Sequence, residues 1–162
     1  MFEVLVFVYE NYWRGDACPE LQQLGRKLSA HGFEPEEIQQ ALDWLDGLHF
    51  AAQGTQLSDE VEPPAADGPT QSSHSLRVYS ISEQDHLGAQ CLGFISFLES
   101  AGVLPPAMRE IVVDRAMAAP GDPVALDDLK IIVLMVYWSM GHEPDALVLD
   151  ELCDDTTGRL AH

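Results

Sequence analysis

A glycine followed three residues later by a proline interrupts the chain twice, at Gly32/Pro35 and 70 residues further on at Gly102/Pro105. Glycine suits the left-handed conformation just past a helix end, and the apolar residue after it packs back onto the last helical turn. Proline suits the first turn of the next helix, where its missing N–H needs no partner. Each break therefore predicts a tight hairpin of two helices.

Apolar residues on both sides of each break recur at helical spacing, which predicts that every helix buries one stripe. The stripes of the two hairpins stay in register when the numbering is shifted by 70 residues. This register fits an internal repeat, and it also fits the punctuation that any tight helical hairpin needs. The predicted fold is all-α, with two hairpin-containing halves around a shared or adjoining core. The paired positions are Leu24/Phe94, Leu28/Leu98, Ile38/Met108, Ala41/Ile111 and Leu42/Val112.

A segment of different composition separates the two hairpins. It contains three prolines, two glycines, four acids and no lysine or arginine, so it cannot bury enough apolar surface to offset the entropy lost on ordering. The predicted organisation is an N-terminal helical half at 1–51, an acidic, proline-rich linker at 52–75, a C-terminal helical half at 76–153 and a flexible acidic tail at 154–162.

Four further elements are expected outside the hairpins. Residues 2–13 are apolar on nearly every side, and we favour a buried helix over a buried strand because no partner strand is evident nearby. Residues 76–81 alternate between apolar and polar, which fits one short β segment. Ser82, with Asp85 three residues later, is typical of the helix start that follows. A central buried helix is expected at 126–140 and a short helix from 144 to about 152.

Acidic residues dominate the charge of the chain: 27 acids and eight bases give a formal charge of −19. DNA phosphates repel such a surface unless its few cations gather on one face. The break at Gly32 resembles a helix-turn-helix, but its second helix, expected from 34 to about 49, carries five acids and no lysine or arginine. We expect a protein partner with a basic surface rather than nucleic acid, with a helix-turn-helix-like DNA-binding protein as the alternative.

The sequence lacks the usual patterns of catalysis and metal binding. It contains no GxSxG, HExxH, Walker or GxGxxG motif, and its three cysteines form no CxxC pair. Paired acids at helix starts and in the tail are expected to be capping or solvated charges. We therefore expect no enzymatic activity, no cofactor and no metal. A secretory signal and a membrane-length apolar run are not evident, which predicts a cytoplasmic protein.

Arg115 occupies the position in the second hairpin that Leu45 has in the first, which is a core-facing position. A buried charge without a partner is costly, so we expect a carboxylate beside it, with Glu99, Glu110 and Asp114 as candidates. Arg115 is then part of a site for a partner or an anion, or else a structural ion pair or a cation at the helix edge. The candidate interaction residues are Arg77, Tyr79, Arg109, Glu110, Asp114 and Arg115.

The chain resembles the Smg family of bacterial proteins in five segments: MFEVLVFVYENYW, LGRKLSAHGFEPEEIQQALDWL, LRVYSISEQDHL, GFISFLESAGVLPPAMREIVVDRAM and LKIIVLMVYW. They cover nearly the whole chain except the linker, and the fourth is the most specific. The family has no established biochemical activity, so the resemblance implies an all-helical, bacterial, cytoplasmic protein and carries over no catalytic or binding residue. Members are often encoded near DNA-processing genes. Together with the charge, this favours a non-enzymatic adaptor or regulator, one version of which acts on a DNA-processing protein.

Overall fold

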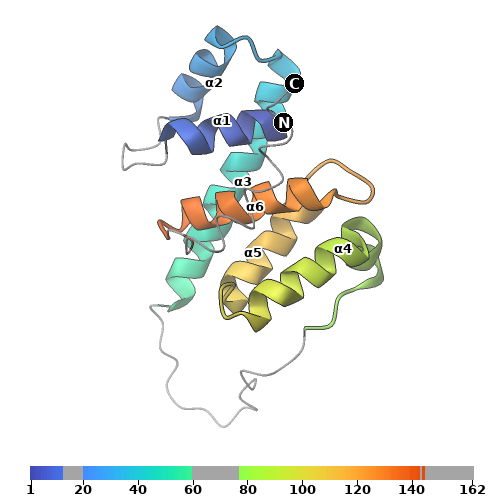
Figure 1. The fold of residues 1–162 in the computed structure, drawn as a ribbon. Coiled ribbons are helices and arrows are strands. Elements are labelled where there is room, and N and C mark those ends of the chain that lie inside the picture. Colours follow the sequence, from blue (N-terminus) through green and yellow to red (C-terminus); the bar gives the residue numbers. More distant parts are fainter. Residues whose placement is uncertain (13–19, 60–76, 143, 145–162) are drawn as a thin grey trace.

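The computed structural model describes residues 1–12, 20–59, 77–142 and 144. This part of the chain folds into helices and contains no strand (Figure 1), which confirms the all-α class. None of these helices is long and apolar enough to cross a membrane. The linker residues 60–75, the tail and the short helix expected after 144 lie outside the described residues. The helices are α1 Phe2–Tyr12, α2 Leu21–Ala30, α3 Pro35–Asp59, α4 Ile81–Ser100, α5 Pro106–Met117 and α6 Leu126–Ser139.

Helix α6 lies at the centre of the fold and packs against α1, α3, α4 and α5. Every residue from Leu129 to Tyr137 is buried, so this helix meets other side chains on all sides, as its sequence predicts. Helices α1 and α3 come from the first half of the chain, and α4 and α5 come from the second. The two halves therefore bury their apolar side chains in one shared core.

Helix α3 is the longest, with 25 residues, and it packs against α1, α2, α5 and α6. It continues past its predicted end near 49 to Asp59. The change in composition at Ala52 suggested a linker, but the first proline after it is Pro63, so no residue there breaks a helix. The buried stripe also continues to Ala52, which is 4% exposed. Residues 52–59 therefore belong to α3 rather than to a linker.

Both predicted hairpins are present, and their first helices end in the same way. Gly32 after α2 has a φ of 93°, and Gly102 after α4 has a φ of 72°. The N–H of the next residue donates to the carbonyl five positions before it, over 3.4 Å at Phe33 and 3.0 Å at Val103. These are the hydrogen bonds of the Schellman motif that the glycines predicted.

The residues before α4 do not form the predicted β segment. Residues 77–80 have no regular secondary structure, and no strand of the described chain lies beside them. Their alternation instead directs Arg77 toward carboxylates of α4 and α5, and Tyr79 against the core. Val78 faces outward and is 89% exposed. The alternating pattern therefore separates an inner from an outer side without a partner strand.

Helix α4 begins two residues earlier than the sequence indicated. The side chain of Ser80 accepts from the N–H of Glu83, and the side chain of Glu83 accepts from the N–H of Ser80. This reciprocal capping box satisfies two N–H groups at the helix start, which a pair of Ser82 and Asp85 would not do in this register.

The Schellman end of α4 leads to a prediction for two glycines of one helix hairpin. Neither Gly102 nor Gly93 has an atom within 4 Å of the position that a Cβ would take. Of these two glycines, Gly102 has a positive φ and Gly93 has the φ of a helix. Gly102→Ala is expected to lower the free energy of unfolding by about 1–2 kcal/mol because an L-residue is strained there. Gly93→Ala, in the middle of α4, is expected to raise it by about 0.5–1 kcal/mol. Urea unfolding followed by circular dichroism measures both, and equal effects would contradict the motif.

Candidate functional site

The six candidate interaction residues lie in two separate places. Asp114 and Arg115 lie against α3, beside Trp44 and Gly47, and we call these four residues the α3–α5 joint. The other four candidates lie in the segment before α4 and on α5, and two more acids join them, one from the start of α4 and one from its end. We call this group the polar cluster. Its members are Arg77, Tyr79, Glu83, Glu99, Arg109 and Glu110.

Two arginines of the polar cluster share the carboxylate of Glu110. Arg77 donates from Nε to Glu110 over 2.8 Å and from Nη2 to Glu83 over 2.9 Å. Arg109 donates from Nε to Glu110 over 2.9 Å and from Nη1 to Glu99. Charge-assisted hydrogen bonds of this kind are the stronger ones in proteins. They connect the residues before α4 with α5 and connect the end of α4 with α5.

Tyr79 lies beside the guanidinium of Arg77, whose Cζ is 4.6 Å from the centre of the ring. This distance is typical of a cation–π contact. The Tyr79 hydroxyl and Nη1 of Arg77 are both buried, and neither has a hydrogen-bond partner among the described residues. Burial raises the pKa of Tyr79, and the negative charge of Glu99 raises it further. The phenol therefore stays neutral and supports Arg77 with its ring.

The charge of Glu83 is stabilised by two neighbours. The hydrogen bond from Arg77 lowers the pKa of Glu83 to about 2, and the backbone N–H of Ser80 lowers it as a second cause. The same carboxylate is half of the capping box of α4. Glu83 therefore joins the helix start to the ion pairs of the polar cluster.

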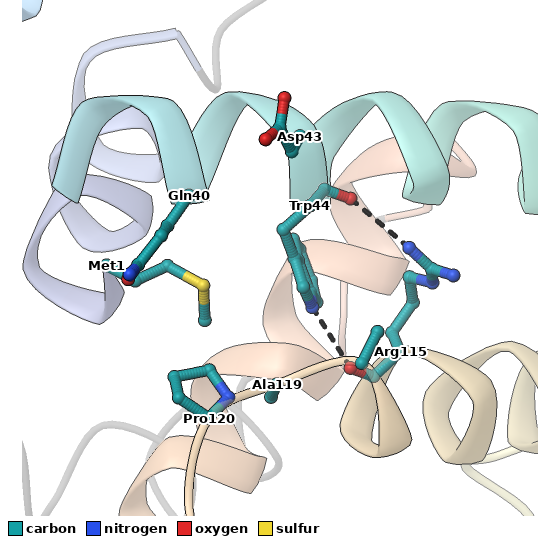
Figure 2. A pocket seen from close by; sticks show the side chains of 8 residues that line it. Met1, Gln40, Asp43, Trp44, Arg115, Ala119 and Pro120 are labelled. Atoms are coloured by element: carbon teal, nitrogen blue, oxygen red, sulfur yellow. Dashed lines mark hydrogen bonds between the residues drawn. The ribbon is translucent and has the colours of Figure 1, made fainter. Parts of the chain in front are cut away.

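In the α3–α5 joint, Trp44 and Arg115 bind each other in both directions (Figure 2). The indole N–H of Trp44 donates to the carbonyl of Arg115 over 3.0 Å, and Nη1 of Arg115 donates to the carbonyl of Trp44 over 3.5 Å. The guanidinium also donates to Asp114 over 2.7 and 2.9 Å. A carboxylate beside Arg115 was predicted, and of the three candidates Asp114 is the one in place.

Gly47 explains how a cation can take the position that corresponds to Leu45. A Cβ at Gly47 would lie 2.0 Å from Nη1 of Arg115, so any side chain at this position would have to move the end of the Arg115 side chain from its present place on α3. A glycine inside a helix costs about 1 kcal/mol relative to alanine. A glycine in the middle of α3 was therefore a signal that could be seen in the sequence, but nothing in the sequence connects it with Arg115.

A pocket of about 440 Å³ opens beside the joint, and we call it the Trp44 pocket. Its apolar lining comes from several parts of the chain, and two polar side chains of α3 lie at its edge (Figure 2). Because these parts are far apart in the sequence, no local sequence pattern indicates this site. The main lining residues are Met1, Gln40, Asp43, Trp44, Ala118 and Pro120.

Most cations of the described chain are turned away from solvent. The side chains of Arg77, Arg109 and Arg115 are 19%, 13% and 14% exposed, and Lys130 is 4% exposed. On the described surface the exposed cations are Arg26 and Lys27 of α2. The exposed acids are far more numerous: Glu3, Glu10, Glu20, Glu34, Glu36, Asp43, Asp46, Asp85, Glu110, Asp114 and Asp122.

Cys91 is a packing residue in the described core. Its thiol donates to the carbonyl of Val124 over 3.3 Å, and burial raises its pKa to about 11. A thiol in this state is a poor nucleophile at neutral pH. Among the described residues no group of three or more His, Cys, Asp and Glu side chains could hold a metal ion.

The chain is similar over its full length to several curated proteins. Residues 1–162 match the family described as "Protein of unknown function (DUF494)". The chain is 65% identical to the "Protein Smg homolog" of Leptothrix cholodnii and 60% identical to that of Methylibium petroleiphilum, with all of both chains covered in each comparison. It is 48% identical to the protein of the same name in Herminiimonas arsenicoxydans, again over the whole of both chains. No solved structure matches the chain.

The contact between Gly47 and Arg115 can be tested by adding one methyl group. Gly47→Ala is expected to change the free energy of unfolding less favourably than Gly93→Ala does, by about 1 kcal/mol. The reason is that the added methyl group must displace the guanidinium. In an Arg115→Met background the same substitution should give the ordinary gain of a helical alanine. Urea unfolding of the four proteins measures the coupling, and a penalty that persists without Arg115 would contradict the contact.

The low pKa of Glu83 predicts a pH-dependent contribution to stability. The folded pKa of about 2 lies below the ordinary value of 4.5, so folding favours the ionised carboxylate. This stabilisation is present above the ordinary pKa and is lost as the pH falls toward 2. Glu83→Gln is expected to be less stable than wild type at pH 7, with a difference that shrinks in urea titrations between pH 5 and pH 3. Asp85→Asn, an exposed neighbour on α4, is the control and should leave this pH dependence unchanged.

Proposed function

The chain belongs to the Smg family of proteins of unknown function, and we propose that it is a non-enzymatic adaptor or regulator that binds a protein partner through an acidic surface. The observation that carries this proposal is the separation of charge described above. Three arginines and a lysine lie in ion pairs or in the interior, while many acids remain exposed. The exposed charged side chains of the described residues are therefore mostly acids.

The free side of α3 is the part of this surface best suited to a partner. Glu36, Asp43 and Asp46 are exposed along it, and no lysine or arginine of the described chain forms an ion pair with any of them. Phe50, 81% exposed, continues the same side of the helix. A partner that brings basic groups to this face would be attracted from a distance, which raises the association rate and disfavours wrong partners.

Direct DNA binding is the second candidate, because α2, the turn at Gly32 and α3 have the order of a helix-turn-helix. A recognition helix enters the major groove between two rows of phosphates. Here that helix would bring Glu36, Asp43 and Asp46 toward them, and Arg115, beside the helix, is already paired with Asp114. The exposed cations of this unit, Arg26 and Lys27, lie on α2 and not on the helix that would enter the groove, so the recognition helix itself would meet the phosphates with acids.

A catalytic role is not part of the proposal. In the polar cluster and in the α3–α5 joint, each arginine already forms an ion pair with at least one carboxylate. The Cys91 thiol is buried and protonated, and the nearby His86 ring contacts the carbonyl of Ala116 over 3.2 Å. We propose a cytoplasmic protein without a cofactor, for which a DNA-processing protein with a basic surface is one class of partner.

The proposal is tested by capture of tagged protein from its own host lysate at low salt, after nuclease treatment, with two charge-reversed variants. The first carries Glu36→Lys, Asp43→Lys and Asp46→Lys on α3. The second carries Glu3→Lys, Glu10→Lys and Glu20→Lys, which change the net charge equally on exposed positions elsewhere. Wild type and the second variant should recover one stoichiometric, basic protein that is released as salt rises. The α3 variant should recover at least about tenfold less, equivalent to 1.4 kcal/mol or more.

Two outcomes would contradict this proposal. Equal loss in both variants would show a diffuse charge effect without a defined face. Recovery that disappears with nuclease, together with binding of a purified DNA duplex by the isolated protein, would favour the DNA-binding alternative.

A further inference from the structure

The Trp44 pocket has a volume of about 440 Å³, within the range of sites that hold a ligand group. Its floor is apolar, but Trp44 is 3% exposed and Ala119 is 5% exposed. The apolar surface that it offers is therefore a narrow strip. Such a strip has room for the stem of one side chain and not for the broad face of a helix.

The charge at the mouth of the pocket is negative. Asp43 lies at the edge and is exposed, and its described partner is the neutral amide of Gln39 at 2.7 Å. Arg115 also lines the pocket, but its guanidinium is held by Asp114 and by the carbonyl of Trp44. The ammonium of Met1, another lining residue, is paired with Glu37 over 3.5 Å. The positive charges at the pocket are thus compensated within the fold, and the charge of Asp43 is not.

Figure 2 shows how these groups are arranged. The indole of Trp44 lies between the arginine on one side and Met1 and Gln40 on the other, with Pro120 below and Asp43 on the helix above. In this view the carboxylate of Asp43 lies at the upper edge of the helix and the indole, Met1 and Pro120 lie below it, so a side chain on the apolar strip must reach past the helix edge to meet the carboxylate. A long side chain with an aliphatic stem and a positive end fits this arrangement. Lysine and arginine have this form, since they pack the stem on apolar surface while the charge stays near water.

We propose that the Trp44 pocket receives an arginine or lysine side chain of the protein partner, with the stem against the apolar strip and the charged end at Asp43. The proposal rests on the proposed function, because it identifies where the acidic face of α3 is read by a partner. Glu36 and Asp46 lie on the same helix, before and after the pocket. They attract a basic segment, and the pocket selects the position of one side chain within it.

The probe is N-acetyl-arginine methylamide, titrated into isotopically labelled protein at low salt and followed by NMR. It is expected to shift the indole N–H of Trp44 and the backbone N–H of Gln40 and Ala118. The citrulline analogue, which has the same shape without the charge, should not. Asp43→Asn is expected to weaken binding of the arginine probe roughly two- to fivefold, the range of an exposed ion pair.

Two matched controls separate the pocket from the general charge of the surface. Asp46→Asn removes the same charge from an exposed position of α3 that does not line the pocket, and it should leave binding of the probe unchanged. Ala118→Arg fills the pocket from its rim and should abolish the shifts, whereas Ala107→Arg, exposed at the start of α5, should not.

The outcomes distinguish this inference from the proposed function. Shifts confined to the pocket and sensitive to Asp43 support it. Equal weakening by Asp43→Asn and Asp46→Asn, or equal shifts with the citrulline analogue, would overturn it. If a basic partner is captured through α3 and the arginine probe does not reach the pocket, the inference fails and the proposed function stands. If the probe binds but no partner depends on α3, the pocket is a cation site and the proposed function fails.

Discussion

The burial of α6 on all sides is the constraint on which the rest of the structure depends. Its residues from Leu129 to Tyr137 are buried, so no single hairpin could cover them and four helices are required around them. Even Lys130 lies in this interior, 4% exposed, with its ammonium 5.8 Å from the ring of Phe94. Because helices of both halves cover α6, neither half has a complete core without the other. The two halves of the sequence thus form one packed unit.

This arrangement sets where α3 and α5 meet, and the α3–α5 joint shows how a cation fits there. Helices α3 and α5, which both pack on α6, meet close to Trp44. The backbone carbonyl of Arg115 accepts a hydrogen bond from Trp44, and the carbonyl of Trp44 accepts one from Arg115. Gly47 removes the side chain that would block the guanidinium, and Asp114 supplies its counter-charge. A leucine at this position would have extended the apolar stripe. The arginine instead fixes the crossing by directed hydrogen bonds, at the cost of a glycine inside a helix.

The features that could be predicted from the sequence are those fixed by neighbouring residues. The hairpin turns depend on Gly32 and Gly102, and the structure has them with the expected hydrogen bonds. The end of α3 was misplaced because composition changes before the helix is broken. The β segment predicted at 76–81 was wrong. Alternating apolar and polar residues show that a segment has an inner and an outer side, but they do not show that a partner strand lies beside it. The polar cluster and the Trp44 pocket join residues from distant parts of the chain. Their composition could be suspected from single residues, as with Arg115, but their geometry depends on how the helices pack.

The distribution of charge determines how this surface would bind a partner in the proposed interaction. Arginines placed between helices form ion pairs that are partly shielded from water and therefore less screened by salt. The acids left outside are exposed to salt, so their attraction for a basic partner is strongest at low ionic strength and weakens as salt rises. Such a surface speeds encounter and disfavours acidic partners, but it does not distinguish one basic patch from another. Discrimination requires a place where shape and charge must match together. On the described surface the Trp44 pocket is where an apolar strip, an uncompensated carboxylate and a fixed helix crossing coincide. In the proposed interaction, long-range attraction by α3 and local selection by the pocket are thus properties of a single helix held in place by α6.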